Sequence, residues 1–476
     1  MNAERFRVEK DFLGEVLVPK DAYYGAETVR ALENFRISGL RFPHAFIRAL
    51  AMVKACASLA NMSLGLLDKK RGEAIYFAAI EVVEGRMDEH FPIDVIQTGS
   101  GTSINMNMNE VIANRAAEML GGEKGDKSLI HPNDHVNMGQ SSNDVVPTAI
   151  RVAAAEEINK KLIPSLEKMI RALELKSEEF RGVVKSGRTH LRDAVPVTLG
   201  QEFSGYAEMM RKGLSSIVRA SEGLLELPIG GTATGTGLNT HPEFGKKVAE
   251  YLSEKIGLQF KITNNRFEAM GSQGAVLEVS ASLRTVALNL LKICNDLRLL
   301  SSGPNTGLNE IEIPPVQPGS SIMPGKVNPV IIEAAMLASC LVIGNDTAIV
   351  EASRVGELEL NLGNPLIAYL LLQSIEVLSN ALDVLSEKAL RGIRANIDKC
   401  RHYAERSTAL ITVAAPLIGY DKAAEILARA QREGITIKEL LVDTGYLDRG
   451  TAEKILDVEK MSRGGLIIPS SFRKEE

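Results

Sequence analysis

Residues 276–300 read VLEVSASLRTVALNLLKICNDLRLL and carry an apolar side chain at every third or fourth position. The positions of this heptad stripe are Val276, Val279, Leu283, Val286, Leu290, Ile293, Leu297 and Leu300. Such a repeat is typical of helices that pack against one another in bundles. Leu277, Leu288 and Leu291 add a second apolar side, which must also be buried. The stretch therefore predicts a long helix inside a bundle, packed against other subunits as well as its own chain.

The same stripe recurs elsewhere in the chain. One repeat consists of Leu371, Ile375, Leu378, Leu382 and Leu385, and another of Leu162, Leu166, Met169 and Leu173. Pro164 lies inside the second repeat and predicts a kink, because proline lacks the N–H that a helix interior needs. Shorter helical patterns cover residues 43–67, 70–84 and 105–120, and a further helix is expected to begin at Asp144.

The predicted fold class is all-α, with a central long-helix bundle between smaller, mainly helical terminal domains. The 476 residues exceed what one simple core usually holds. Residues 1–45 read as irregular, with a short strand pair, and segments after about residue 395 are shorter and more charged. We expect an N-terminal domain over residues 1–140, the bundle domain over 141–395 and a small helical C-terminal domain over 396–476.

Composition excludes several classes of partner. The net charge is −5 with no dense Lys/Arg run, and tryptophan is absent. Nucleic-acid or anionic-membrane binding is therefore not indicated. The first residues lack an apolar signal-peptide core, and the most apolar run, 334–344, is too short to span a bilayer and is expected to form a buried helix. Cys56, Cys294, Cys340 and Cys400 lie far apart, which favours reduced core thiols in a cytoplasmic protein and gives no metal-binding pattern.

Residues 318–329 read PGSSIMPGKVNP and lie between helical patterns. Proline and glycine exclude a helix interior or a central strand. The loop carries two hydroxyls, an ammonium and an amide, on Ser320, Ser321, Lys326 and Asn328. A polar connecting loop is the simpler reading, but these groups could also hold a carboxylate and exchange a proton, and loops on rigid frames often carry function.

Three other loops are rich in small polar residues: 99–102 (GSGT), 140–143 (QSSN) and 187–191 (GRTHL). We expect each to lie at a helix end, where free N–H groups and hydroxyls suit carboxylates. Taken singly, residues 141–144 also read as an N-cap cluster and His190 as a structural histidine.

Together these four loops resemble, in order and approximate spacing, the signature loops of the fumarase/aspartase superfamily, over nearly the whole chain. The resemblance implies a homotetramer whose active sites are shared between subunits. It also implies reversible anti elimination from a small dicarboxylate to give fumarate, without a metal or other cofactor. The reaction passes through a dianion that needs preplaced hydrogen-bond donors and a base.

The resemblance assigns roles to individual residues. It implies Ser320 as the base and His190, paired with Glu333, as a group that tunes or relays protons. Glu333 also reads as a first-turn acid that favours the helix dipole. The substrate ligands implied are Ser100, Thr102, Ser141, Ser142, Asn143, Thr189, Ser321, Lys326 and Asn328. A possible secondary dicarboxylate site consists of His131, Asn133 and Asp134, which also read as an ordinary turn.

Two activities of the superfamily stay open. Ser142 and residues 106–110 and 419–425 are similar to fumarate hydratases, whereas residues 9–14 and 307–311 are similar to aspartate ammonia-lyases. Ser142 lies where the leaving group would be sensed, so fumarate hydratase is the preferred interpretation and aspartate ammonia-lyase the alternative. A non-catalytic structural homologue is a third possibility, which the intact set of polar residues disfavours.

Overall fold

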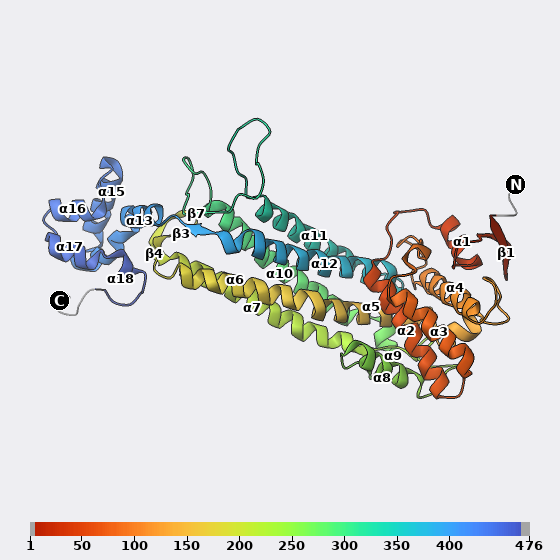
Figure 1. Ribbon diagram of the computed structural model, residues 1–476. Helices are drawn as coiled ribbons and strands as arrows, with labels where there is room; N and C mark the ends of the chain where they lie inside the picture. Colours follow the sequence, from red (N-terminus) through yellow and green to blue (C-terminus); the bar gives the residue numbers. More distant parts are fainter. Residues whose placement is uncertain (1–4, 468–476) are drawn as a thin grey trace. The chain divides into compact units, whose positions relative to one another are not determined.

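The structure, a computed structural model, describes residues 5–467. It is mainly helical, as predicted, and contains short two-stranded sheets, of which only the first was expected (Figure 1). Its internal contacts divide the chain into two compact units. The described part of unit 1 covers residues 5–165, Gly213–Leu288 and Ala338–Asn380, and that of unit 2 covers Leu166–Lys212, Asn289–Leu337 and 381–467.

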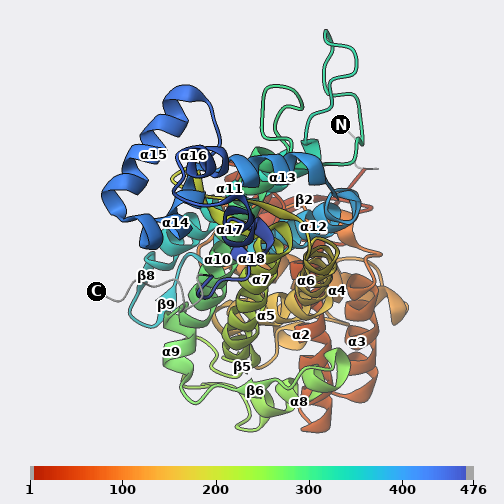
Figure 2. The same cartoon turned by 90° about the vertical axis from the view of Figure 1, so that its left-hand side faces the viewer.

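Unit 1 begins with the expected strand pair, an antiparallel hairpin of β1 (Phe6–Asp11) and β2 (Gly14–Pro19). The helices that follow are α1 (Ala26–Asn34), α2 (His44–Ser63), α3 (Lys69–Val83), α4 (Thr102–Met119), α5 (Ser142–Glu157), α8 (Phe244–Ile256) and α9 (Arg266–Gly271). The two-residue pairs β5 (Glu226–Leu227) with β6 (Lys261–Ile262) and β8 (Gly356–Glu357) with β9 (Leu360–Asn361) complete this unit. The apolar helix α2 packs against α3, α5 and α8, and Figure 2 shows it beside α3.

Five long helices have residues in both units: α6 (Ile163–Glu179), α7 (Leu199–Ser221), α10 (Gly274–Leu300), α11 (Val330–Ser353) and α12 (Asn364–Lys388). Every residue of the three predicted stripes is buried. The heptad interpretation is therefore confirmed, because the apolar side of each helix is removed from water. A π-helical turn, Ile158–Leu162, joins α5 to α6 just before Pro164. The predicted irregularity takes this form because Pro164 has no N–H to donate to the preceding turn.

Unit 2 contains the hairpin of β3 (Val184–Thr189) and β4 (Arg192–Thr198) and the pair β7 (Ile311–Glu312) with β10 (Arg394–Ala395). Its last helices are α13 (Ile397–Arg406), α14 (Ile411–Ile418), α15 (Tyr420–Glu433), α16 (Ile437–Asp443), α17 (Arg449–Ile455) and α18 (Val458–Met461). Their apolar side chains form one cluster that includes Ala414, Ile426 and Leu440.

Helix α11 differs from its prediction in two ways. The apolar run 334–344 is the middle of a 24-residue helix, so α11 is, like three other described helices, long and apolar enough by length and composition to cross a membrane. The prediction that this segment is too short to span a bilayer was wrong, because less apolar residues on both sides extend the helix. The prediction of burial holds for one side only, since just 33% of its most apolar window is buried within the chain. Cys340 is exposed there and is not a core thiol, whereas Cys56, Cys294 and Cys400 are buried.

Helix α6 offers a matched test of the stripe. Leu173 is fully buried and Leu175 is 71% exposed on the same helix. We expect Leu173→Ala to lower the free energy of unfolding by about 2–5 kcal/mol, because it removes packed methyl groups and leaves a cavity. Leu175→Ala should change it by less than about 0.5 kcal/mol. Thermal unfolding monitored by circular dichroism measures both, and equal shifts would contradict the assignment of the stripe.

Candidate functional site

Three of the predicted hydroxyls in unit 1 lie together at the starts of α4 and α5. The Oγ atom of Ser100 is 2.7 Å from Oγ1 of Thr102, which is 2.9 Å from Oγ of Ser142. Gly101 makes this approach possible: its φ is +79°, and a Cβ there would lie 2.9 Å from the side chain of Val146. Two helix N-termini and a row of hydroxyls form a polar surface suited to a carboxylate.

The start of α5 is fixed by a capping box. Ser141 is the N-cap, and its backbone N–H donates to the Asp144 carboxylate at 2.9 Å. The helix thus begins at Ser142, two residues before the predicted start, because Ser141 is the N-cap and Asp144 is the third helical residue of the capping box. Ser141 therefore has the structural role that the N-cap interpretation gave it.

Asp144 also holds a glycine-rich loop against α5. Its fully buried carboxylate accepts the N–H groups of Gly230 and Thr232, both at 2.9 Å. Burial raises the pKa of Asp144 to about 6, although these donors and Lys54 favour the charged form. In the same loop Ala233 accepts a hydrogen bond of 2.9 Å from Nδ2 of Asn143. The sequence analysis did not select Asp144, whose only signal was its place three residues after Ser141.

In unit 2 the segment GRTHL forms the end of β3 and the two-residue turn to β4, so its prediction as a helix end was wrong. His190 and Leu191 have φ values of +53° and +57°. Two successive residues with positive φ make the turn that suits the twist of a hairpin. The sequence concealed this turn because neither residue is the glycine, asparagine or aspartate that usually signals it. Thr189 and His190 are both exposed in the single chain.

A buried ion pair anchors this hairpin. Two nitrogens of Arg188 donate to the two carboxylate oxygens of Glu310 at 2.9 and 3.0 Å, and Glu310 is fully buried. Nζ of Lys185 lies 3.3 Å from the same carboxylate. A bidentate pair of this kind restricts orientation as well as distance. It fixes the residue directly before Thr189 and His190, and sequence reasoning missed it because the two partners are far apart in the chain.

The loop 318–329 is closed at its base by hydrogen bonds. Gly319 donates its N–H to the Lys326 carbonyl at 2.9 Å, and Nδ2 of Asn328 donates to the Gly319 carbonyl at 2.6 Å. A Cβ at Gly319 would lie 2.6 Å from the backbone nitrogen of Asn328, so this close approach requires glycine.

The tip of the loop is open. Ser321 and Lys326 are exposed, and Figure 1 shows an open loop between β7 and α11. Oγ of Ser320 accepts the N–H groups of Ile322 and Met323 at 3.2 and 3.0 Å.

Glu333 lies half-buried in the first turn of α11. No hydrogen bond or ion pair joins it to His190 within the described part of the single chain. The pairing of these two residues stays a prediction.

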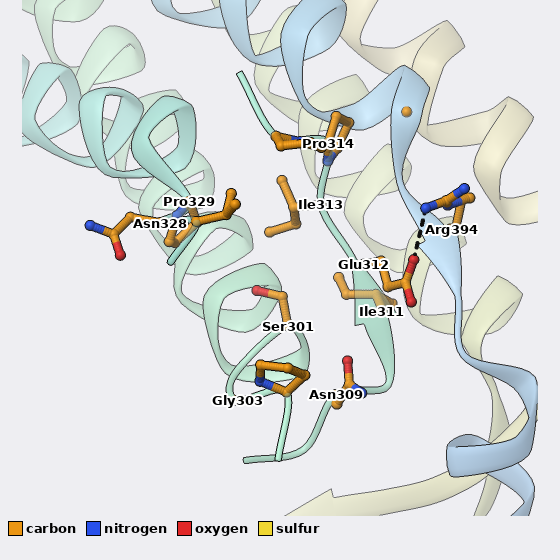
Figure 3. A pocket seen from close by; sticks show the side chains of 14 residues that line it. Ser301, Gly303, Asn309, Ile311, Glu312, Ile313, Pro314, Asn328, Pro329 and Arg394 are labelled. Atoms are coloured by element: carbon orange, nitrogen blue, oxygen red, sulfur yellow. Dashed lines mark hydrogen bonds and ion pairs between the residues drawn. The ribbon is translucent and has the colours of Figure 1, made fainter. Parts of the chain in front are cut away.

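A cavity of about 580 Å³ opens beside the end of this loop (Figure 3). Its lining comes from the end of α10, the segment around β7, residues 327–329 and β10, and it includes Asn328 but neither Ser320 nor Lys326. At one side Arg394 pairs with Glu312 at 3.0 Å. The cavity therefore borders the point where the loop returns to α11 rather than the residues at its tip.

The residues of the possible secondary site lie at the start of a π-helical turn in unit 1, Pro132–Val136, with His131 as its N-cap. Nδ1 of His131 accepts the N–H groups of Asn133 and Asp134 at 3.1 and 3.2 Å. The side chains of Asn133 and Asp134 are exposed. Among residues 5–467, no group of three or more His, Cys, Asp or Glu side chains is placed to hold a metal ion.

Comparison with known proteins assigns the family. Residues 14–344 match the family described as Lyase, and the chain belongs to it. Residues 410–463 match the family described as Fumarase C C-terminus, which covers the last helices of unit 2.

Individual relatives agree with this assignment. The chain is 52% identical over 465 residues, 98% of its length and 99% of the relative's, to the fumarate hydratase class II of Halobacterium salinarum. A crystal structure of recombinant class II fumarase from Schistosoma mansoni is 38% identical with a TM-score of 0.93, covering 96% of this chain and 99% of that one. A cobalt-bound crystal structure of fumarate lyase:delta crystallin from Brucella melitensis is 46% identical with a TM-score of 0.92, over the same shares.

Two Arg–Glu pairs test the hairpin anchor. Arg188→Gln removes the guanidinium and leaves the buried Glu310 carboxylate with Lys185 as its remaining positive neighbour among the described residues. We therefore expect a loss of about 3 kcal/mol in the free energy of unfolding. Arg394→Gln removes an exposed pair with Glu312 and should leave stability nearly unchanged. Thermal unfolding of the two variants measures the difference. A stable Arg188→Gln protein would show that the buried pair does not anchor the hairpin.

Proposed function

We propose that this protein is a class II fumarate hydratase, which catalyses the reversible anti elimination of water from L-malate to give fumarate. The observation that carries this proposal is the 52% identity, over nearly the full length of both chains, to a protein of that name. The joined hydroxyls of Ser100, Thr102 and Ser142 support it, because they offer donors for a substrate carboxylate at two helix N-termini.

Removing a proton beside a carboxylate needs a base and stabilisation of the dianion that forms. We assign the base to Ser320, on the breaker-rich loop, with the ammonium of Lys326 and backbone N–H groups favouring its ionised form. Thr102, Ser142, Asn143 and the remaining predicted ligands would hold the carboxylates. His190 with Glu333 would pass a proton to the departing hydroxide.

The alternative activity is aspartate ammonia-lyase. The two reactions differ in the leaving group, and Ser142 is the residue on which our preference for water depends. It is buried and bonded to Thr102, so its hydroxyl is fixed near the proposed carboxylate donors. A non-catalytic structural homologue is the remaining alternative.

We further propose a homotetramer with active sites shared between subunits. Leu288 of α10 and Leu337 and Leu341 of α11 leave apolar surface exposed in the single chain, and association would remove it from water. Asn345 and Asp346 on α11, buried and bonded within the chain, favour protein partners over lipid for this helix. Exposed Thr189, His190 and Lys326 would gain their partners from neighbouring copies.

The proposal includes a cytoplasmic location and a part in the tricarboxylic acid cycle. Four free cysteines agree with a reducing compartment. The use of His131, Asn133 and Asp134 as a secondary dicarboxylate site stays a prediction.

The substrate decides between the three activities. We expect the purified protein to form fumarate from L-malate and not from L-aspartate, measured by the ultraviolet absorbance of fumarate. Fumarate from aspartate alone would identify an ammonia-lyase. Fumarate from neither would favour the structural homologue.

A single substitution tests the base. Ser320→Ala should lower kcat by about 10²–10⁴-fold, because no proton acceptor replaces the hydroxyl. Its mass in solution should equal that of the unsubstituted protein. Ser353→Ala, at the end of α11, is the control and should keep full activity. Turnover retained in Ser320→Ala would remove this residue as the base.

A further inference from the structure

The four residues that precede Ser141 are held by polar side chains of two helices in unit 1. From α2, Lys54 donates its Nζ to Oδ1 of Asn137 at 2.8 Å and to Oε1 of Gln140 at 3.0 Å. Asn61, two turns further along the same helix, donates Nδ2 to the Met138 carbonyl at 3.0 Å. This segment leads directly into the capping box and the hydroxyl of Ser142.

Helix α4 holds the same segment from a second direction. Asn105 and Asn109, one turn apart, each donate Nδ2 to Oδ1 of Asn137 at 3.2 Å. Within the segment Gln140 donates its N–H to the Asn137 carbonyl at 3.0 Å, and Nδ2 of Asn137 donates to the Gln140 carbonyl at 3.1 Å. The side-chain oxygen of Asn137 thus receives three donors, of which the ammonium of Lys54 is the only charged one among the described residues.

Burying the ammonium of Lys54 costs desolvation free energy, which packing alone would not require. Lys54 is fully buried between Val53 and Ala55 on a mainly apolar helix, where a methionine of similar length would cost no desolvation. Burial lowers its pKa to about 7, and the charge of Asp144 opposes this shift. Buried charges of this kind concentrate at functional sites.

We propose that Lys54 is a positioning residue for the reaction: by bridging Asn137 and Gln140 it fixes the segment that places Ser141, Ser142 and Asn143 against Thr102. The inference rests on the proposed function for its catalytic consequence. In this role Lys54 acts through the geometry of the loop, where displacements of about 1 Å can cost on the order of 100-fold in rate.

The test uses Lys54→Met in the full-length protein, with two readouts. Hydrogen exchange of peptides covering residues 137–144 should accelerate, because the bridge that restrains them is absent. With L-malate, kcat/KM should fall about 10–100-fold. Gln140→Ala removes the Oε1 acceptor and the Nε2 bonds to the Val136 and Met138 carbonyls, and leaves the ammonium. It should show the same two effects and replaces Lys54→Met if that variant does not fold. The double variant should lose less than the sum of the two single losses, since both changes break the bond between Lys54 and Gln140.

Lys176→Met is the matched control. Lys176 is also buried and donates Nζ to the Ile393 carbonyl and to Glu179, both at 2.7 Å. Its removal should leave kcat/KM within about 2-fold and exchange at 137–144 unchanged, even if the melting temperature falls. Unchanged exchange at 137–144 in Lys54→Met, or faster exchange with unchanged kcat/KM, would overturn the proposal. An inactive unsubstituted protein would overturn the proposed function instead, and the exchange result would still decide whether Lys54 holds the segment.

Discussion

The buried carboxylate of Asp144 is the constraint on which the polar site of unit 1 depends. It accepts N–H groups from Ser141, Gly230 and Thr232, which belong to two segments far apart in the chain. A buried carboxylate is tolerated only when such donors surround it. Because they do, the start of α5 and the glycine-rich loop cannot move separately, and Ser142 faces Thr102 across two helix N-termini.

A second buried charge, Lys54, contacts the residues directly before this helix start. The carboxylate of Asp144 accepts hydrogen bonds from backbone N–H groups, whereas the ammonium of Lys54 donates to side-chain oxygens of Asn137 and Gln140. Each stabilises the other's charged form, so burial raises the pKa of one and lowers that of the other less than isolation would. The segment between them is therefore ordered by polar contacts, whereas its helices are ordered by apolar ones.

Unit 2 divides its polar residues differently. Arg188 and Glu310 are buried and compensate one another, but Thr189, His190, Ser321 and Lys326 face solvent in the single chain. Their supports are rigid, a hairpin turn and a loop closed at Gly319, while the groups themselves lack the enclosure that catalysis needs. The apolar side of α11 is likewise left uncovered in the single chain. Association of identical chains, as proposed above, would supply both.

The sequence by itself determined the helical class, the buried stripes of α6, α10 and α12, and the strand pair at the start. Periodicity and short motifs report these because they depend on neighbours a few residues apart. Only the tertiary structure decided that GRTHL ends a strand and turns into the next one, and that one side of α11 is exposed in the single chain. It also decided that Glu310 is the buried partner of Arg188, Asp144 that of Gly230 and Lys54 that of Gln140. These features depend on residues separated by tens to more than a hundred positions. No local pattern encodes such pairings, because burial and electrostatic compensation arise only when distant segments pack together.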